Sequence, residues 1–415
     1  MDFQSKTHEK IYQLLKKGVD IPSPHTLYIG DEVNSDQISG KGVKIYPGCR
    51  IHGSKTVISS GCNLGFEAPV TIEDCQLGCA VELKGGFFSK SVFLDKANMG
   101  MGAHVREGCI LEEEAGGAHC VGLKHTILFP FVTLGSLINF CDCFMAGGTS
   151  RSNHSEVGSS YIHFNFTPDA DKTTPSMLGD VPRGVMLNQP PIFLGGQGGI
   201  IGPVRLGYGN VVAAGSILRR DYPKNNQLIS ENTPASIVKE YVSASYHGIV
   251  RIVENNILYL ANLTALEAWY ALIRKPFLES QQFGLLLYAG VMEQLSAAKK
   301  ERLKRLKIMA QKAASASPKQ KKLKSTREAL YKNTEDIKDI LYEKIKDDVT
   351  ESIRKEFSRD FIQSVGKGRK TYIETIQKLP PDVSAKGVKW LQNIVDYYCQ
   401  RISTVIPSLK LFRIH

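Results

Sequence analysis

The stretch IFLGGQGGIIGPVRLGYGNVVAAGSILRRD, residues 192–221, decides the fold of this chain of 415 residues. An aliphatic residue recurs in it every sixth position, often followed by glycine, as in Leu194-Gly195 and Leu206-Gly207. Because a helix repeats near 3.6 residues and a strand near 2, a period of six predicts short straight segments joined by regular corners. Stacked coils of such segments bury their aliphatic side chains along one axis, as in a parallel β-helix. The recurring residues are Leu194, Ile200, Leu206, Val212 and Leu218, with Ile58, Leu64 and Val70 upstream.

The period of six begins near Ile38 and gives way to helical patterning after Tyr222. Apolar residues then recur at spacings of three and four, as in IVRIVENNILYLANLTALEAWYALIRKPF, which is typical of helices with one buried face. We therefore predict a fold that is mainly β plus all-α, in three parts. These are an N-terminal helix and lead-in over residues 1–30, a β-helix over residues 31–225, and a basic α-helical domain over residues 226–415.

The positive charge of the chain is concentrated in its helical half. The formal net charge is +11, and the excess of lysine and arginine lies after Asn225. Residues 299–327, KKERLKRLKIMAQKAASASPKQKKLKSTR, contain one acid, Glu301. Such a tract is most often a solvated helix and linker, and a patch for nucleic acid or another anionic surface is the alternative. No aromatic residues alternate with the basic ones, which favours the first interpretation.

Nine cysteines, an odd number without a CxxC pair, indicate reduced thiols rather than a disulfide framework or a zinc site. The cluster Cys141-Asp142-Cys143 is expected to pack at a corner, and no metal is expected there. No stretch reaches about 18 uninterrupted apolar residues, and the first residues lack the apolar core of a secretion signal. We expect a cytoplasmic protein without a membrane span.

Three ordered segments between Val121 and Tyr222 carry a resemblance to a known family. They are His125-Thr126-Ile127-Leu128 followed by Leu134-Gly135, VGSSYIHFNFTPDADKTT at residues 157–174, and the stretch 192–221. Together they resemble the acetyltransferase half of the bifunctional N-acetylglucosamine-1-phosphate uridyltransferase and glucosamine-1-phosphate acetyltransferase, a hexapeptide-repeat transferase. The resemblance implies coils that wind left-handed and a homotrimer with its sites between subunits.

The resemblance also implies roles for single residues. His125 would be the general base, and a neutral imidazole with a pKa near 6.5 can take a proton from an attacking acceptor at cellular pH. His163 is the reserve base. In the implied site, Asn165 and Lys172 hold the sugar phosphate, Ser159 faces the acyl thioester, and Gly196 and Ala214 present backbone to the pantetheine arm of acetyl-CoA or another acyl-CoA.

Two features differ from the family pattern. Glu112-Glu113-Glu114 stands where the family has a lysine pair that helps to hold phosphate, and three carboxylates at such a site would repel a sugar phosphate. About one extra coil lies between Gly135 and Val157, which could separate His125 from Asn165 by a full turn. The family's uridyltransferase half has no counterpart in residues 1–120, which lack a glycine-rich nucleotide loop.

These observations predict an acyl-CoA-dependent acyltransferase that acts on a sugar phosphate or a nucleotide sugar. The alternative is a non-enzymatic β-helix scaffold whose basic helical tail binds an anionic partner. Hexapeptide repeats alone specify an architecture, and function resides in the sites built on it.

Overall fold

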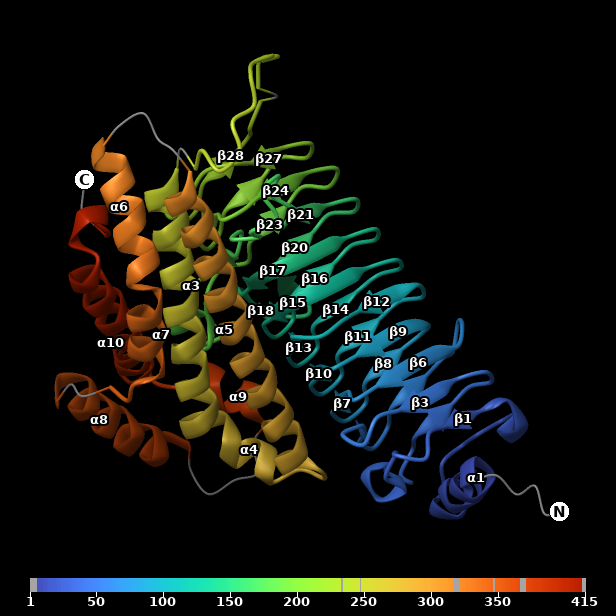
Figure 1. Ribbon diagram of the computed structural model, residues 1–415. Helices are drawn as coiled ribbons and strands as arrows, with labels where there is room; N and C mark the ends of the chain where they lie inside the picture. Colours follow the sequence, from blue (N-terminus) through green and yellow to red (C-terminus); the bar gives the residue numbers. More distant parts are fainter. Residues whose placement is uncertain are drawn as a thin grey trace.

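The computed structural model describes residues 6–232, 234–246, 248–316, 321–345, 348–365 and 371–412. It is a parallel β-solenoid of about 11 turns, followed by a helical region that lies along one side of it (Figure 1). The predicted fold class is therefore confirmed. Leu194, Ile200 and Val212 are completely buried inside the coil, as the period of six predicts.

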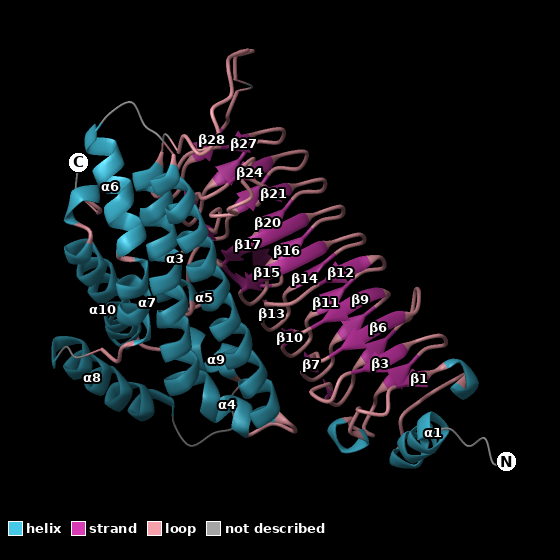
Figure 2. Cartoon of the chain, in the orientation of Figure 1, coloured by secondary structure: helices cyan, strands magenta, loops and turns pink. Residues whose placement is uncertain are grey.

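Most turns of the solenoid have a short strand on each of three faces, which we call the first, second and third face in chain order (Figure 2). The first face contains β1 (Tyr28–Ile29), β3 (Arg50–His52), β6 (Val70–Glu73), β9 (Gly86–Ser89), β12 (Ala103–Val105), β21 (Ile162–Phe164), β24 (Gly199–Ile201) and β27 (Ile217–Leu218). The second face contains β4 (Val57–Ile58), β7 (Gln76–Leu77), β10 (Ser91–Phe93), β13 (Cys109–Leu111), β22 (Ser176–Leu178) and β25 (Arg205–Leu206). Two longer strands, β15 (Gly122–Leu128) and β17 (Asn139–Met145), run over both faces.

The third face forms a separate sheet of ten strands. Its members are β2 (Lys44–Ile45), β5 (Asn63–Leu64), β8 (Glu82–Leu83), β11 (Asn98–Met99), β14 (Gly116–Gly117), β16 (Thr133–Leu134), β20 (Glu156–Val157), β23 (Phe193–Leu194), β26 (Val211–Val212) and β28 (Leu228–Ile229). Leu194 pairs with Val212 and Val212 with Ile229, so equivalent residues of successive turns stack on one another. A small hairpin of β18 (Gly148–Ser150) and β19 (Asn153–His154) interrupts the repeat.

The corner between the first and second faces requires a left-handed backbone. Lys90, Gly108, His125 and Asp142 occupy it in successive turns with φ of 48°, 81°, 47° and 59°. Glycine adopts this conformation freely, whereas other residues pay about 1 kcal/mol. Because a lysine and an aspartate adopt it too, the positive φ is a property of the corner and not of the chemistry of His125.

Helices cover the second face of the solenoid, and a further helix lies near the N-terminus. Near the N-terminus lie α1 (Lys6–Lys17) and the 3₁₀ turns η1 (Pro24–Thr26) and η2 (Ser35–Gln37), and α2 (Val181–Gly184) is a short helix within the solenoid. The helical region contains α3 (Ile249–Trp269), the π-helical η3 (Tyr270–Arg274), α4 (Lys275–Glu279), α5 (Gly284–Ser315), α6 (Lys321–Lys332), α7 (Thr334–Tyr342), α8 (Asp348–Val365), α9 (Tyr372–Gln377), α10 (Pro381–Val405) and the 3₁₀ turn η4 (Pro407–Leu409). Helices α3 and α5 lie next to the solenoid, and α6 and α8 lie outside them (Figure 1). Helix α10 packs against α3 and also contacts α2 of the solenoid.

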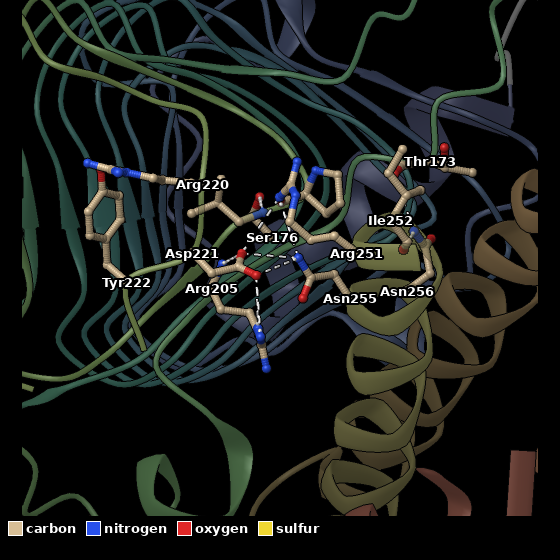
Figure 3. Close-up of polar contacts among 12 residues, drawn as sticks. Thr173, Ser176, Arg205, Arg220, Asp221, Tyr222, Arg251, Ile252, Asn255 and Asn256 are labelled. Carbon is tan, nitrogen blue, oxygen red and sulfur yellow. Dashed lines mark hydrogen bonds and ion pairs between the residues drawn. The ribbon is translucent and has the colours of Figure 1, made fainter. Parts of the chain in front are cut away.

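Polar contacts fasten the N-terminal half of α3 to the last turns of the solenoid (Figure 3). The carboxylate of Asp221 accepts hydrogen bonds from the Arg205 backbone N–H at 2.9 Å and from Asn255 Nδ2 at 3.1 Å. Arg251 lies 3.7 Å from the same carboxylate, and Asn256 Nδ2 donates to the Thr173 carbonyl at 3.2 Å. The register of α3 along the second face is thus set by directional bonds as well as by apolar packing.

The basic tract 299–327 begins in the C-terminal half of α5. Three of its basic residues are buried. Arg327 donates to backbone carbonyls, and the other two form ion pairs: Lys299 Nζ lies 2.5 Å from Glu267, and Arg302 lies 2.8 Å from Asp142 of the solenoid. The interpretation of the tract as a solvated helix is wrong for these two residues, because they hold α5 against its neighbours. Residues 317–320 of the tract lie outside the described residues. No described helix is long and apolar enough to cross a membrane.

Candidate functional site

His125 lies at the corner in the middle of β15, where the strand passes from the first face to the second. Its backbone N–H donates to the Glu107 carbonyl at 3.0 Å. Its Nδ1 is buried against Gly108 and has no hydrogen-bond partner among the described residues. Burial lowers the pKa of His125, and nearby Arg302 acts in the same direction, although Asp142 opposes them. The imidazole is therefore neutral at pH 7.

An open cavity of about 440 Å³ separates this corner from α5. It is lined by Glu107, Lys124 and His125 of the solenoid and by Ala297, Lys300, Glu301, Lys304 and Arg305 of α5. Two ion pairs neutralise part of the lining, since Lys124 lies 2.6 Å from Glu107 and Arg305 lies 2.6 Å from Glu301. Within the described residues, Lys300 and Lys304 have no ion-pair partner. They leave a positive charge at the mouth of the cavity, which we call the histidine cavity.

The same corner continues through the next two turns as a ladder of polar residues. Lys124 pairs with Cys141 and Thr126 with Cys143, so Asp142 stacks directly on His125. Asn165, one turn further, donates from Nδ2 to Asp142 Oδ2 at 3.4 Å. One turn therefore lies between the turns of His125 and Asn165, and Asp142 is its corner residue.

Arg302 of α5 closes this ladder from the helical side. It pairs with Asp142 at 2.8 Å and donates from Nη1 to the Lys172 carbonyl at 2.9 Å. Three of the residues singled out in the sequence, His125, His163 and Asn165, thus lie around one buried carboxylate, and Arg302 links this carboxylate to the Lys172 carbonyl. The side chain of Lys172 itself makes no described contact with His125.

The reserve base, His163, is an interior residue. It is 2% exposed, and its Nε2 lies 2.7 Å from Ser176 Oγ in a polar contact between two turns. Burial lowers the pKa of His163 to about 4. Because His163 and Ser176 are both buried inside the coil, the imidazole of His163 does not reach a substrate at the surface of the described structure.

The predicted acyl-CoA residues occupy a different corner, between the third and first faces. Ser159, Gly196 and Ala214 follow one another there in successive turns, and all three are at least partly exposed. A Cβ on Gly196 would lie 2.7 Å from the Ser159 carbonyl, so only glycine fits between the turns. The first face separates this corner from His125, and the structure does not bring the two sets together within one chain.

The acidic residues Glu112 and Glu113 connect the solenoid to the helical region. Glu112 and Glu113 lie at the corner between the second and third faces, where Glu112 accepts a hydrogen bond from Tyr270 and Glu113 pairs with Arg274 at 2.7 Å. Burial raises the pKa of Glu112 to about 7. Glu114 lies 3.7 Å from Lys96. The expectation that three free carboxylates repel a sugar phosphate is wrong for Glu112 and Glu113, because both are buried and face partners in η3.

Comparison with known proteins finds relatives for about half of the chain. A stretch of 215 residues, 52% of the chain, is 30% identical to bifunctional protein GlmU of Thermotoga maritima, of which it covers 42%. A stretch of 223 residues, 54% of the chain, is 27% identical to bifunctional protein GlmU of Carboxydothermus hydrogenoformans, of which it covers 44%. About half of this chain is homologous to GlmU. The predicted resemblance is thereby confirmed, although no protein-family model matches the sequence.

The chain spans less than half the length of the GlmU proteins that it matches. The matched stretches are about as long as the solenoid. What the helices add to a GlmU-like solenoid is therefore the question that the structure raises.

Sequence reasoning did not connect Lys300, Lys304 and Arg305 with His125. The tract 299–327 was recognised as basic, but its helical spacing alone does not say which solenoid corner it meets. Lys300, Glu301 and Lys304 follow Ala297 at spacings of three, four and seven, which places them on one side of α5. This spacing is the sequence signal that could have grouped them. Within the described residues, no group of His, Cys, Asp and Glu could hold a metal ion, and all nine cysteines are free thiols.

Proposed function

We propose that the protein is an acyltransferase that moves an acyl group from acyl-CoA to a sugar phosphate or a nucleotide sugar at the histidine cavity. The observation that carries this proposal is the meeting, in one cavity of a GlmU-like solenoid, of His125 with Lys300 and Lys304, two lysines without an ion-pair partner among the described residues. A base and an anion-binding pair in one cavity suit a phosphorylated acceptor.

The proposed chemistry assigns His125 the proton transfers. Its neutral imidazole accepts the proton of the acceptor's amine or hydroxyl as that group attacks the thioester carbonyl. The C–S bond then breaks, and the imidazolium returns the proton to the departing CoA sulfur. The lowered pKa of His125 keeps the base unprotonated at pH 7, and general base catalysis of this kind contributes roughly a hundred- to ten-thousand-fold.

The family binds phosphate with a lysine pair, and this chain has Glu112-Glu113-Glu114 at that position. In this proposal, Lys300 and Lys304 bind the phosphate instead. Asn165 and Lys172 remain proposed contacts for the acceptor through the ladder that joins them to His125. The phosphate site is thus supplied by the helical region of this chain instead of by the solenoid.

The thioester and the pantetheine arm of the acyl donor are proposed to lie at Ser159, Gly196 and Ala214. Because that corner is separated from His125 by the first face, a donor bound there serves the His125 of a neighbouring chain. The proposal therefore includes a homotrimer with sites between subunits, in which the first and third faces are available for contact and α3 and α5 occupy the second.

Release of the CoA thiol tests the reaction. We would mix the purified protein with acetyl-CoA and glucosamine 1-phosphate or UDP-sugars, and compare it with the variants His125→Gln and His25→Gln. His25 is an exposed histidine at the far end of the solenoid and controls for the substitution type. We expect kcat to fall at least about a hundredfold in His125→Gln and to be unchanged in His25→Gln. Equal thiol release by all three proteins would contradict the role of His125.

One observation favours the alternative of a non-enzymatic scaffold. Nδ1 of His125 is buried and has no hydrogen-bond partner in the part of the chain that the structure describes, whereas a catalytic base is ordinarily oriented by a partner on its second nitrogen. A protein that binds neither acetyl-CoA nor any acceptor, yet binds an anionic polymer with a steep salt dependence, would be such a scaffold.

A further inference from the structure

A second cavity adjoins the histidine cavity on the other side of α5. It lies between α5 and α7, has a volume of about 260 Å³, and is lined in part by Leu303, Lys307, Lys338 and Tyr342. Lys300 and Lys304 line both cavities. The two lysines therefore form a ridge along α5 with a cavity on each flank, and we call this second space the α7 groove.

The α7 groove is positively charged. Its lining contains the four lysines Lys300, Lys304, Lys307 and Lys338 and one carboxylate, Glu335, so the net lining charge is +3. Glu335 is shared, since it lies 2.6 Å from Lys307 and 2.9 Å from Lys338. Its negative charge is thus shared by Lys307 of α5 and Lys338 of α7, and the two ridge lysines remain without an ion-pair partner within the described residues.

An aromatic ring lies at the end of the groove. Tyr342, the last residue of α7, is 45% exposed, and Lys299 Nζ lies 5.2 Å from the centre of its ring. A ring with this exposure, next to basic side chains, is suited to stacking on a nucleobase. The groove thus combines the two contacts that nucleotides use, cations for phosphate and an aromatic surface for the base.

The dimensions also suit a ligand with a diphosphate in its middle. A helix with its side chains is about 10–12 Å across, so a molecule that reaches from His125 over α5 to Tyr342 must bridge a distance of that order. A sugar monophosphate ends at the ridge, whereas a diphosphate with a nucleoside continues into the α7 groove. Two ammonium groups on the ridge match two phosphates.

We propose that the ridge and the α7 groove bind a nucleoside diphosphate, with the phosphates on Lys300 and Lys304 and the base on Tyr342. This inference rests on the proposed function, because it identifies the phosphorylated ligand of the histidine cavity. The same chemistry is present in two sources: a nucleotide sugar, which would be the acceptor, and the adenosine diphosphate end of CoA, which would be the donor.

Calorimetric titration of the full chain with UDP, ADP and inorganic pyrophosphate tests the proposal without any acyl transfer. We expect saturable binding of at least one nucleotide, weakened about tenfold or more in Lys304→Glu. Tyr342→Leu is expected to weaken nucleotide binding roughly tenfold and to leave pyrophosphate binding unchanged. Lys41→Glu, at an exposed lysine in the first turns of the solenoid, makes the same charge change and should bind like the parent protein.

The outcomes separate the two proposals. Tighter binding of UDP than of ADP identifies a nucleotide sugar acceptor, and the reverse identifies the CoA donor. Transfer to a sugar phosphate without binding of either nucleotide at millimolar concentration overturns the nucleotide site and leaves the acyltransferase standing. Nucleotide binding without thiol release from acetyl-CoA, with any acceptor, overturns the acyltransferase instead. Binding of pyrophosphate as tight as that of UDP, with no effect of Tyr342→Leu, also overturns the nucleoside assignment.

Discussion

Arg302 of α5 and Asp142 of β17 form an ion pair of 2.8 Å in which each side chain is 3% exposed. It joins the helical region to the one coil that interrupts the family pattern around His125. Isolated charges of this kind are expensive to bury, so each residue is tolerated because the other is present. The extra coil and the helical region thus depend on each other at this contact.

Removal of one partner should therefore be more harmful than removal of both. We expect Asp142→Leu to lower the free energy of unfolding by about 3–5 kcal/mol, because Arg302 is left buried and unpaired. The double variant Asp142→Leu with Arg302→Met should recover most of that loss. Urea unfolding of the parent, both single variants and the double variant measures the coupling, and strictly additive losses would show that the pair is not coupled.

Gly108 should tolerate a side chain less well than another left-handed glycine. A Cβ on Gly108 would lie 2.1 Å from Nδ1 of His125, whereas a Cβ on Gly215 meets nothing within 4 Å. Since φ is 81° and 76° at the two positions, alanine costs about 1 kcal/mol of backbone strain at either. We expect Gly108→Ala to cost about 1–3 kcal/mol more and to shift the NMR signals of the His125 ring. Equal losses in the two variants would mean that the ring moves aside freely.

His163 should make the protein acid-sensitive. Its folded-state pKa of about 4 lies below the unfolded value near 6.5, so the unfolded chain binds the proton first. Stability is therefore lost as the pH falls from about 6.5 to 4, by on the order of 3 kcal/mol over the whole window. His163→Gln removes this titration, and its unfolding free energy should fall less steeply between pH 7 and 4.5. Parallel pH profiles of the two proteins would contradict the assignment.

Glu112 should make the protein less stable as the pH rises, which is the opposite of the effect of His163. Burial raises its folded-state pKa to about 7, above an unfolded value near 4.5, so the folded protein retains the proton. The stabilisation is full below about pH 4.5 and is lost as the pH rises through 7. We expect Glu112→Gln to be more stable than the parent protein at pH 8, with the difference shrinking towards pH 5. Thermal unfolding at both pH values, with Glu114→Gln as the neighbouring control, measures this; a difference that grows towards pH 5 would exclude it.

The sequence located the candidate residues but not their neighbours. His125, Asn165 and Lys172 were selected by resemblance, and the ladder through Asp142 and Arg302 connects them in the folded chain. The acidic run Glu112-Glu113-Glu114 was expected to repel a sugar phosphate, because a carboxylate is assumed to be exposed and charged until its partner is known. Its partners, Tyr270 and Arg274, lie far away in the chain and meet it only after the helices pack.

Local patterns in the sequence are enough to predict the solenoid and the helical second half, because a period of six and a period near 3.6 are properties of neighbouring residues. The face that α3 and α5 cover, and hence the meeting of Lys300 and Lys304 with His125, is known only from the folded chain. Such contacts depend on how the surface of the helices packs against the surface of the solenoid, and the local periodicity of the sequence does not specify that packing.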